Sequence, residues 1–82
     1  MFVETIHRGE VTELVACSPN KDTLRKKMRK QIEDFIKEVY GEDWREDEEY
    51  EWLTKPEEVE DFWSDGDDEY ETVFQIDEVE EI

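Results

Sequence analysis

Side chains suited to catalysis are scarce in this 82-residue chain, which has one histidine, His7, and one cysteine, Cys17. A general acid or base needs a hydrogen-bonding partner and a pocket, and the sequence indicates neither for His7. Cys17 ends a β-branched stretch, and no second histidine is present to activate its thiol, so we expect a buried structural cysteine. There is no glycine-rich phosphate loop and no Gly-x-Ser-x-Gly elbow. The sequence therefore predicts a non-enzymatic protein without catalytic residues or a cofactor.

Carboxylates are abundant, so a metal site needs a direct test. An EF-hand loop places oxygen ligands at positions 1, 3, 5 and 12 around a glycine at position 6. With Gly66 at position 6, Trp63 and Thr72 occupy positions 3 and 12, and the pattern fails. No Cys/His cluster offers a zinc site. We predict no bound metal, and keep an irregular Ca²⁺ or Mg²⁺ site near Asp65, Asp67 and Asp68 as an alternative.

The charge of the chain is large and unevenly distributed. The formal net charge is −17, and residues 41–82 contain most of the Asp and Glu but only two basic residues, Arg45 and Lys55. Such a field repels nucleic acid and anionic membranes and attracts basic protein surfaces. We therefore expect a basic protein surface as the partner, with no direct binding of nucleic acid or membrane.

A basic run in the first half of the chain qualifies this expectation. We interpret the run as neutralising part of the acidic half, residues 41–82, either within one chain or across a dimer. The sequence is therefore compatible with a monomer and with a homodimer. The residues of the run are Lys21, Arg25, Lys26, Lys27, Arg29 and Lys30.

The first half of the chain predicts a β-hairpin followed by a long helix. The β-branched stretches 2–7 and 11–17 flank Gly9, which favours a hairpin with its loop at residues 7–10. Ser18 or Asn20 can cap a helix that ends at Gly41. Apolar residues at spacings of three and four form one face of this helix: Leu24, Met28, Ile32, Phe35, Ile36, Val39 and Tyr40.

The acidic half predicts a short helix and a final strand. Residues 54–57 fit a Thr-x-x-Glu capping box, so we expect a helix through Trp63 with Val59, Phe62 and Trp63 turned inward. A turn at 64–67 precedes alternating residues 70–77, which place Tyr70, Thr72, Phe74 and Ile76 on one side of a strand. The predicted fold is a single α+β domain over residues 1–82, ordered ββααβ, with a three-stranded antiparallel sheet and the long helix packed on one face.

The expected location is the cytoplasm. A single cysteine cannot form an intramolecular disulfide, and no apolar run approaches the roughly 20 residues that span a bilayer.

The acidic half combines carboxylates with aromatic residues, chiefly in the segments 42–52 and 65–71. Carboxylates two apart on a strand are about 6.6 Å apart and those four apart on a helix about 5–6 Å. DNA presents one phosphate per about 3.4 Å on each strand. Rows of Asp and Glu therefore approach the charge density of DNA. The expected partner-binding residues are Glu42, Asp43, Glu46, Asp47, Glu48, Glu49, Tyr50, Glu51, Trp52, Asp65, Asp67, Asp68, Glu69 and Glu71.

In size, extreme acidity and interleaved aromatics, these segments resemble the DNA-mimic inhibitors of phages and mobile elements, which include anti-restriction and anti-CRISPR proteins. The resemblance is compositional, covers about half of the chain and implies an inhibitor that acts in a bacterial host cell. We therefore expect the acidic face to occupy the basic, nucleic-acid-binding cleft of a nuclease or CRISPR effector. The alternatives are a small accessory or scaffold domain whose acidity only gives solubility, and a divalent-cation-binding domain.

Overall fold

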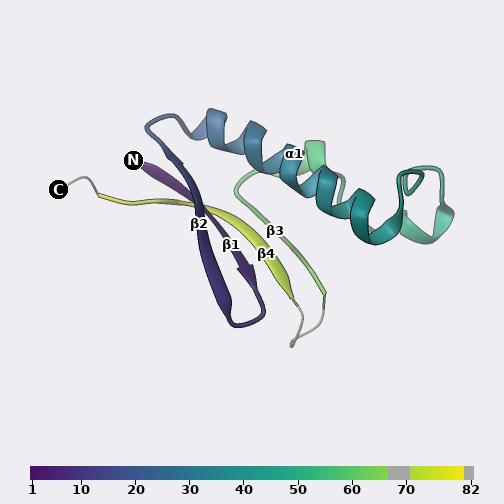
Figure 1. Ribbon diagram of the computed structural model, residues 1–82. Helices are drawn as coiled ribbons and strands as arrows, with labels where there is room; N and C mark the ends of the chain where they lie inside the picture. The colour runs from purple at the N-terminus through teal and green to yellow at the C-terminus, as the bar shows by residue number, and fades with distance from the viewer. Residues whose placement is uncertain (67–70, 81–82) are drawn as a thin grey trace.

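A four-stranded antiparallel sheet with one long helix on one face makes up the fold of the computed structural model, which describes residues 1–66 and 71–80. The strands are β1 (Phe2–Arg8), β2 (Val11–Ser18), β3 (Phe62–Asp65) and β4 (Thr72–Glu78), in the order β2-β1-β4-β3. The helix α1 (Lys21–Tyr40) lies across the sheet (Figure 1). The α+β class is confirmed, but the sheet has four strands where three were expected.

The hairpin and the ends of α1 follow the sequence signals. Gly9 takes a positive φ of 61° in the turn between β1 and β2, a conformation that glycine adopts without steric cost. The Asn20 side chain caps α1 by accepting a hydrogen bond from the Asp22 backbone N–H at 2.9 Å. At the other end, Gly41 has a φ of 98° and donates its N–H to the Lys37 carbonyl.

The expected second helix is wrong. Only a single 3₁₀ turn, η2 (Pro56–Glu58), forms, and its cap position is Lys55 without a side-chain hydrogen bond. The chain is already extended at Val59, and β3 begins at Phe62. Pairing with β4 outweighs the local helix signal because it places Trp63 beside Phe74 in the core. Alternation along β3 then turns Phe62 to the other face of the sheet, where it is exposed rather than buried.

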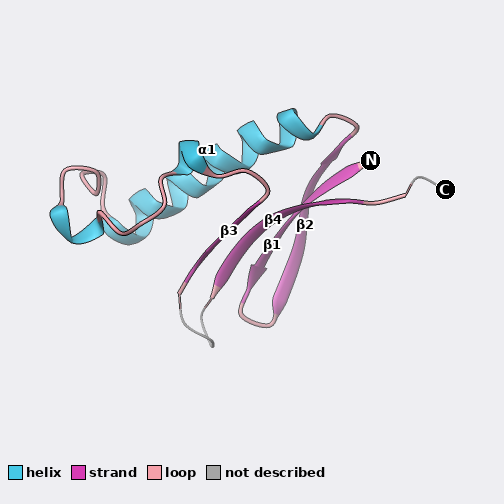
Figure 2. Ribbon diagram, turned by 180° about the vertical axis from the view of Figure 1, so that it is seen from behind, coloured by secondary structure: helices cyan, strands magenta, loops and turns pink. Residues whose placement is uncertain are grey.

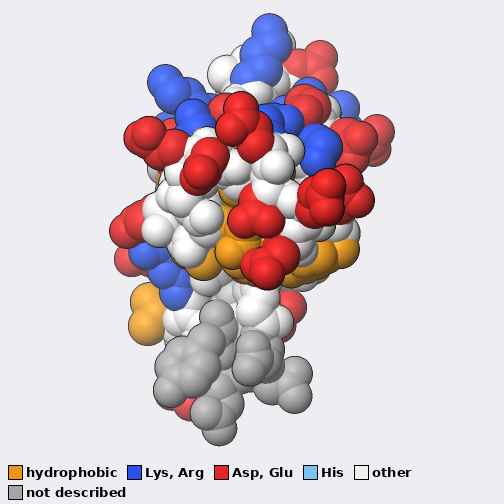
Figure 3. Space-filling view, turned by 90° about the vertical axis from the view of Figure 1, so that its right-hand side faces the viewer, with side chains coloured by type: hydrophobic (Ala, Val, Ile, Leu, Met, Phe, Trp, Pro, Cys, Tyr) orange, Lys and Arg blue, Asp and Glu red, His pale blue; other side chains and the backbone are white. Residues whose placement is uncertain are grey.

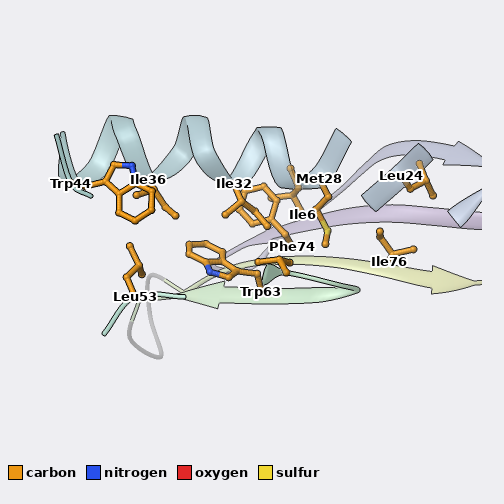
Figure 4. Packing of buried hydrophobic residues seen from close by; sticks show 11 residues of the cluster. Ile6, Leu24, Met28, Ile32, Ile36, Trp44, Leu53, Trp63, Phe74 and Ile76 are labelled. Atoms are coloured by element: carbon orange, nitrogen blue, oxygen red, sulfur yellow. The ribbon is translucent and has the colours of Figure 1, made fainter. Parts of the chain in front are cut away.

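The core lies between α1 and the sheet (Figure 4). The helix contributes Leu24, Met28, Ile32 and Ile36, all buried, whereas Val39 is exposed near the helix end. The predicted inward side of the last strand is confirmed at Thr72, Phe74 and Ile76; Tyr70 lies outside the described residues. The remaining buried apolar side chains are Ile6, Trp44, Leu53, Val59 and Trp63.

One carboxylate, that of Glu4, is fully buried between β1 and α1. The hydrogen-bonding groups around Gln31 set the orientation of its amide. The amide nitrogen faces both carboxylate oxygens of Glu4 and donates to Oε1 at 3.1 Å. Burial raises the pKa of Glu4, and the positive charge of Lys27 acts in the opposite direction. No sequence pattern pointed to this residue, because a glutamate on a strand is normally turned to solvent.

The second face of the sheet is uncovered in the part of the chain that the structure describes. Seen from behind, α1 and the turns after it remain on one side of the strands (Figure 2). Among the described helices, none has an apolar stretch that could span a bilayer.

Candidate protein-binding surface

The segment of residues 42–51, here called the acidic loop, follows directly from the C-terminal end of α1. It is a succession of tight turns closed by backbone hydrogen bonds between residues three apart, including Glu46 N–H to Asp43 O at 3.0 Å and Tyr50 N–H to Asp47 O at 3.2 Å. The 3₁₀ turn η1 (Glu48–Tyr50) is capped by the Asp47 side chain, which accepts from the Glu49 N–H. The acidic loop is therefore folded and is not a tail.

A tryptophan in the middle of the acidic loop holds it against the core. Trp44 is only 1% exposed, although its neighbours Asp43 and Arg45 are exposed. Its side chain lies near Ile36 and Leu53 (Figure 4). The Arg45 guanidinium stacks on the indole at 4.5 Å from its centroid. This apolar anchor sets where the surrounding carboxylates point.

Five carboxylates of the acidic loop line one shallow, open depression of about 600 Å³: Asp43, Glu46, Asp47, Glu48 and Glu49. The tight turns on either side of the extended Asp47 bring these five side chains to the same depression. Within the described residues, none of the five forms an ion pair, although all ten Lys and Arg belong to that part of the chain. The basic residues therefore do not neutralise this patch through ion pairs.

The basic residues neutralise the acidic half only in part. Lys21 and Arg25 both bind Asp61, at 2.6 and 2.8 Å, and the Arg25 hydrogen bond lowers the pKa of that carboxyl group. Arg45 pairs with Glu57, and Arg29 donates instead to the Val59 carbonyl. Seen from the end where α1 terminates, Asp and Glu lie in separate groups with Lys and Arg between them (Figure 3). The negative surface is therefore local and does not cover the whole acidic half.

This chain matches no known family model, and no curated protein or solved structure is significantly similar to it. Its candidate site must therefore be argued from its own geometry.

Aromatic side chains border the acidic loop. The Tyr40 ring lies 4.7 Å from that of Tyr50 and 6.5 Å from that of Trp52, and Trp52 is 67% exposed. The Tyr40 hydroxyl donates to Asp65 Oδ2 at 2.7 Å. Burial, followed by this hydrogen bond, raises the pKa of Tyr40 to about 12. Trp52 is therefore an exposed tryptophan beside the acidic loop, and its ring packs against Tyr40, which in turn packs against Tyr50.

The structure brings together most, but not all, of the expected partner-binding residues. Glu42, Tyr50, Glu51 and Trp52 join the five carboxylates in one continuous segment, and Asp65 reaches it through Tyr40. Glu71 lies apart, because its carbonyl accepts from Gly9 at the hairpin turn. Asp67, Asp68 and Glu69 lie outside the described residues. The carboxylates of the acidic loop are arranged on consecutive turns, so the rows expected along a strand or an α-helix do not form there.

His7 and Cys17 stand apart from this surface. Cys17 is exposed, which corrects the expectation of a buried thiol. Its strand lies at the edge of the sheet, and its side chain shares the uncovered face with that of Val3, its partner on β1. His7 Nδ1 forms a hydrogen bond with the Thr12 hydroxyl at 2.8 Å. No group of three or more described His, Cys, Asp or Glu side chains is arranged to hold a metal ion.

Proposed function

We propose that this protein is a non-enzymatic inhibitor that binds a basic, nucleic-acid-binding cleft of another protein through the acidic loop. The observation that supports this proposal is the patch of five carboxylates without ion pairs, held in place by the buried Trp44. Held carboxylates cost less to position than those of a disordered tail, because less conformational entropy is lost on binding. A cleft built for phosphates offers them complementary charge.

Trp52 adds an apolar contact, which the carboxylates cannot supply. Interfaces obtain much of their binding free energy from a few aromatic and arginine side chains that become buried. Trp52 is exposed beside the acidic loop and rests against Tyr40, so it can be buried by a partner without unfolding the protein. We expect it to be the apolar contact within an otherwise electrostatic interface.

The test is capture of partners by the immobilised protein from a panel of purified nucleases and guide-RNA effectors. We expect a bound partner to be displaced by DNA. We also expect affinity to fall between about 50 and about 500 mM NaCl, as the Debye length shortens from roughly 14 to roughly 4 Å. Binding that ignores both DNA and salt would contradict the proposal.

A charge-matched pair of variants sharpens this test. The first variant carries E46Q, D47N, E48Q and E49Q; the amide that D47N introduces retains an oxygen that can cap η1. The control carries E10Q, E13Q, E78Q and E80Q, four exposed carboxylates outside the acidic loop, and has the same net charge. We expect the first variant to lose about tenfold or more in affinity, because contacts at close range dominate over net charge. The control should bind nearly as well as the original protein.

The alternative, an accessory or scaffold domain whose acidity only gives solubility, makes the opposite prediction. Its binding would use uncharged surface, so both variants should bind as well as the original protein.

A further inference from the structure

The face of the sheet opposite α1, here called the open face, is almost free of charge. Strand register aligns its side chains in rows that cross all four strands. One row runs Leu14, Thr5, Gln75 and Phe62, because Thr5 pairs with Leu14 and with Gln75, and Gln75 pairs with Phe62. Leu14 and Phe62 stand at the two ends of this row, 68% and 59% exposed.

The neighbouring row towards the hairpin turn is also uncharged, and consists of Thr12, His7, Val73 and Ser64. The hydrogen bond between Thr12 and His7 confirms that these side chains share one face. Among the described residues that face this side, carboxylates occur at the two ends of β4, as Asp77 and Glu71.

This lack of charge is unexpected for a surface that faces water. The chain has 27 Asp and Glu among 82 residues, so about one position in three should be acidic, yet both central rows have none. Exposed large apolar side chains together with depletion of charge are typical of the core of a protein–protein interface.

We propose that the open face binds a second copy of this chain, face to face, about a twofold axis that runs parallel to the strands. Such an axis reverses the order of the strands in the second sheet, so β2 of one copy lies over β3 of the other. Because Leu14 and Phe62 share one row, Leu14 of each copy then meets Phe62 of the other. The two most exposed apolar side chains of the face are thereby buried against each other twice.

The distribution of charge favours contact through the open face over contact through the acidic loops. The acidic loop follows α1, on the side of the sheet away from the open face (Figure 1, Figure 2). Packing through the open face therefore places both acidic loops on the outside of the dimer, where mutual repulsion is lowest and both remain accessible. Contact through the acidic loops would instead bring two strongly negative surfaces together.

The area of the open face limits the strength of the dimer. A seven-residue strand is about 23 Å long and four strands are roughly 19 Å wide, which gives roughly 400 Å² on each copy. The total of roughly 800 Å² lies at the small end of protein interfaces. We therefore expect a reversible dimer that forms as the protein concentration rises from about 10 µM to about 1 mM.

The experiment is sedimentation equilibrium of the whole protein over this concentration range, at low and high salt. We expect the average mass to rise from that of a monomer towards that of a dimer. Dimerisation should be tighter at about 500 mM than at about 50 mM NaCl, because salt screens the repulsion between two chains of net charge −17. This dependence is opposite to that expected for the acidic loop and a basic partner, so the two proposals can fail separately. The proposal is overturned if the protein stays monomeric at every concentration and salt. It is also overturned if the open face binds only other proteins and never a second copy.

Substitutions test the contact itself. Leu14→Thr with Phe62→Thr removes both apolar groups without changing charge or β-propensity greatly, and should raise the dimer dissociation constant about tenfold or more. Val39→Thr is the control, since Val39 is an exposed apolar residue on α1 and should leave the constant unchanged. Equal dimerisation by the double variant and the original protein would contradict the proposed contact.

Cross-linking supplies a second readout that does not depend on affinity. In a Cys17→Ser background, Leu14→Cys and Phe62→Cys place two thiols three strands apart, about 14 Å, too far for a disulfide within one chain. Facing positions of two packed sheets lie about 10 Å apart, also beyond a direct disulfide, so the thiols are joined with a bifunctional maleimide whose spacer spans about 10 Å. This reagent should give a covalent dimer and little product within one chain. The control pair, Leu14→Cys with Val39→Cys, should give little dimer; similar yields from both pairs would overturn the arrangement.

Discussion

Arg45 and Glu57 form a bidentate ion pair, with Arg45 Nη1 and Nη2 donating to Glu57 Oε1 and Oε2 at 2.9 and 2.8 Å. The same guanidinium stacks on Trp44. The pair therefore joins the acidic loop to η2, the turn that precedes β3. It is a direct side-chain connection between the proposed binding surface and the turn that leads into β3.

Removing this pair should loosen the acidic loop with a small effect on global stability. The side chains are 41% and 57% exposed, and exposed ion pairs contribute about 0.2–1 kcal/mol. We expect Arg45→Gln to lower the free energy of unfolding by up to about 1 kcal/mol, measured by chemical denaturation. Lys37→Gln, which breaks the i,i+4 pair with Glu33, is the control and should cost less.

The ion pair between Arg45 and Glu57 also makes the free energy of unfolding depend on pH. The hydrogen bonds from Arg45 lower the pKa of Glu57 to about 2, from an ordinary value of 4.5. A carboxyl group with a depressed pKa stabilises the fold above its unfolded pKa and loses this contribution as pH falls through the folded value. The difference between Arg45→Gln and the original protein should therefore be full above about pH 5 and vanish towards about pH 2. A constant difference across this range would contradict the assignment.

Glu4→Gln should stabilise the protein at neutral pH. Burial raises the pKa of Glu4, so the folded state holds the proton more tightly than the unfolded chain. Stability is then greatest below the ordinary value of 4.5 and falls as pH rises towards and through the raised value. The neutral amide avoids this loss, and can still bond to Gln31. Denaturation near pH 7 should show the variant to be more stable, by about 1 kcal/mol, with no gain near pH 4. Glu13→Gln, on an exposed carboxylate of β2, should change neither.

Tyr40 should ionise at a higher pH than an ordinary tyrosine. Its pKa is raised to about 12 by burial and by the hydrogen bond to Asp65. An acid with a raised pKa stabilises the fold below its unfolded pKa of about 10 and loses this contribution as pH rises through about 12. Ultraviolet titration of the three tyrosines should show a late step that disappears in Tyr40→Phe. A late step that persists in the variant would assign it to another residue.

Trp52 should report the negative potential of the acidic loop. Trp44 and Trp63 are 1% and 4% exposed and should be shielded from ionic quenchers, whereas Trp52 is 67% exposed. We expect the ratio of Cs⁺ to I⁻ quenching of Trp52 to be several-fold higher than for a free neutral tryptophan derivative, because a field of one sign concentrates counter-ions. Trp52→Phe should remove most of this quenching. A Cs⁺ to I⁻ ratio equal to that of a free neutral tryptophan derivative would show that the carboxylates are neutralised.

Trp44, within the acidic loop, and Trp52, just after it, should differ in their effect on stability. Trp44→Ala removes a large buried side chain and should cost about 3–5 kcal/mol, a large part of the stability of a small domain. Trp52→Ala should change the free energy of unfolding by less than about 0.5 kcal/mol. Denaturation monitored by circular dichroism measures both. Similar losses would mean that Trp52 belongs to the core.

Elements whose signals are local could be predicted from the sequence. Gly9 marked the hairpin turn, Asn20 and Gly41 the ends of α1, and the spacing of Leu24, Met28, Ile32 and Ile36 its buried face. These features depend on backbone conformation and periodicity within a few residues, so they can be read without knowing the rest of the fold. Local acidity also placed most of the candidate surface in residues 42–51.

Features that depend on distant partners required the three-dimensional arrangement of the chain. A plausible helix signal at 54–63 gave way to β3 because β4, from residues beyond it in the chain, offered strand pairing and a place for Trp63 against Phe74. The burial of Trp44 and the exposure of Trp52, two similar residues in similar acidic surroundings, follow from where the acidic loop meets α1. Basic side chains form ion pairs with Asp61 and Glu57 but with none of the five carboxylates of the acidic-loop patch. This choice of partners depends on distances across the fold, and amino-acid composition carries no information about those distances.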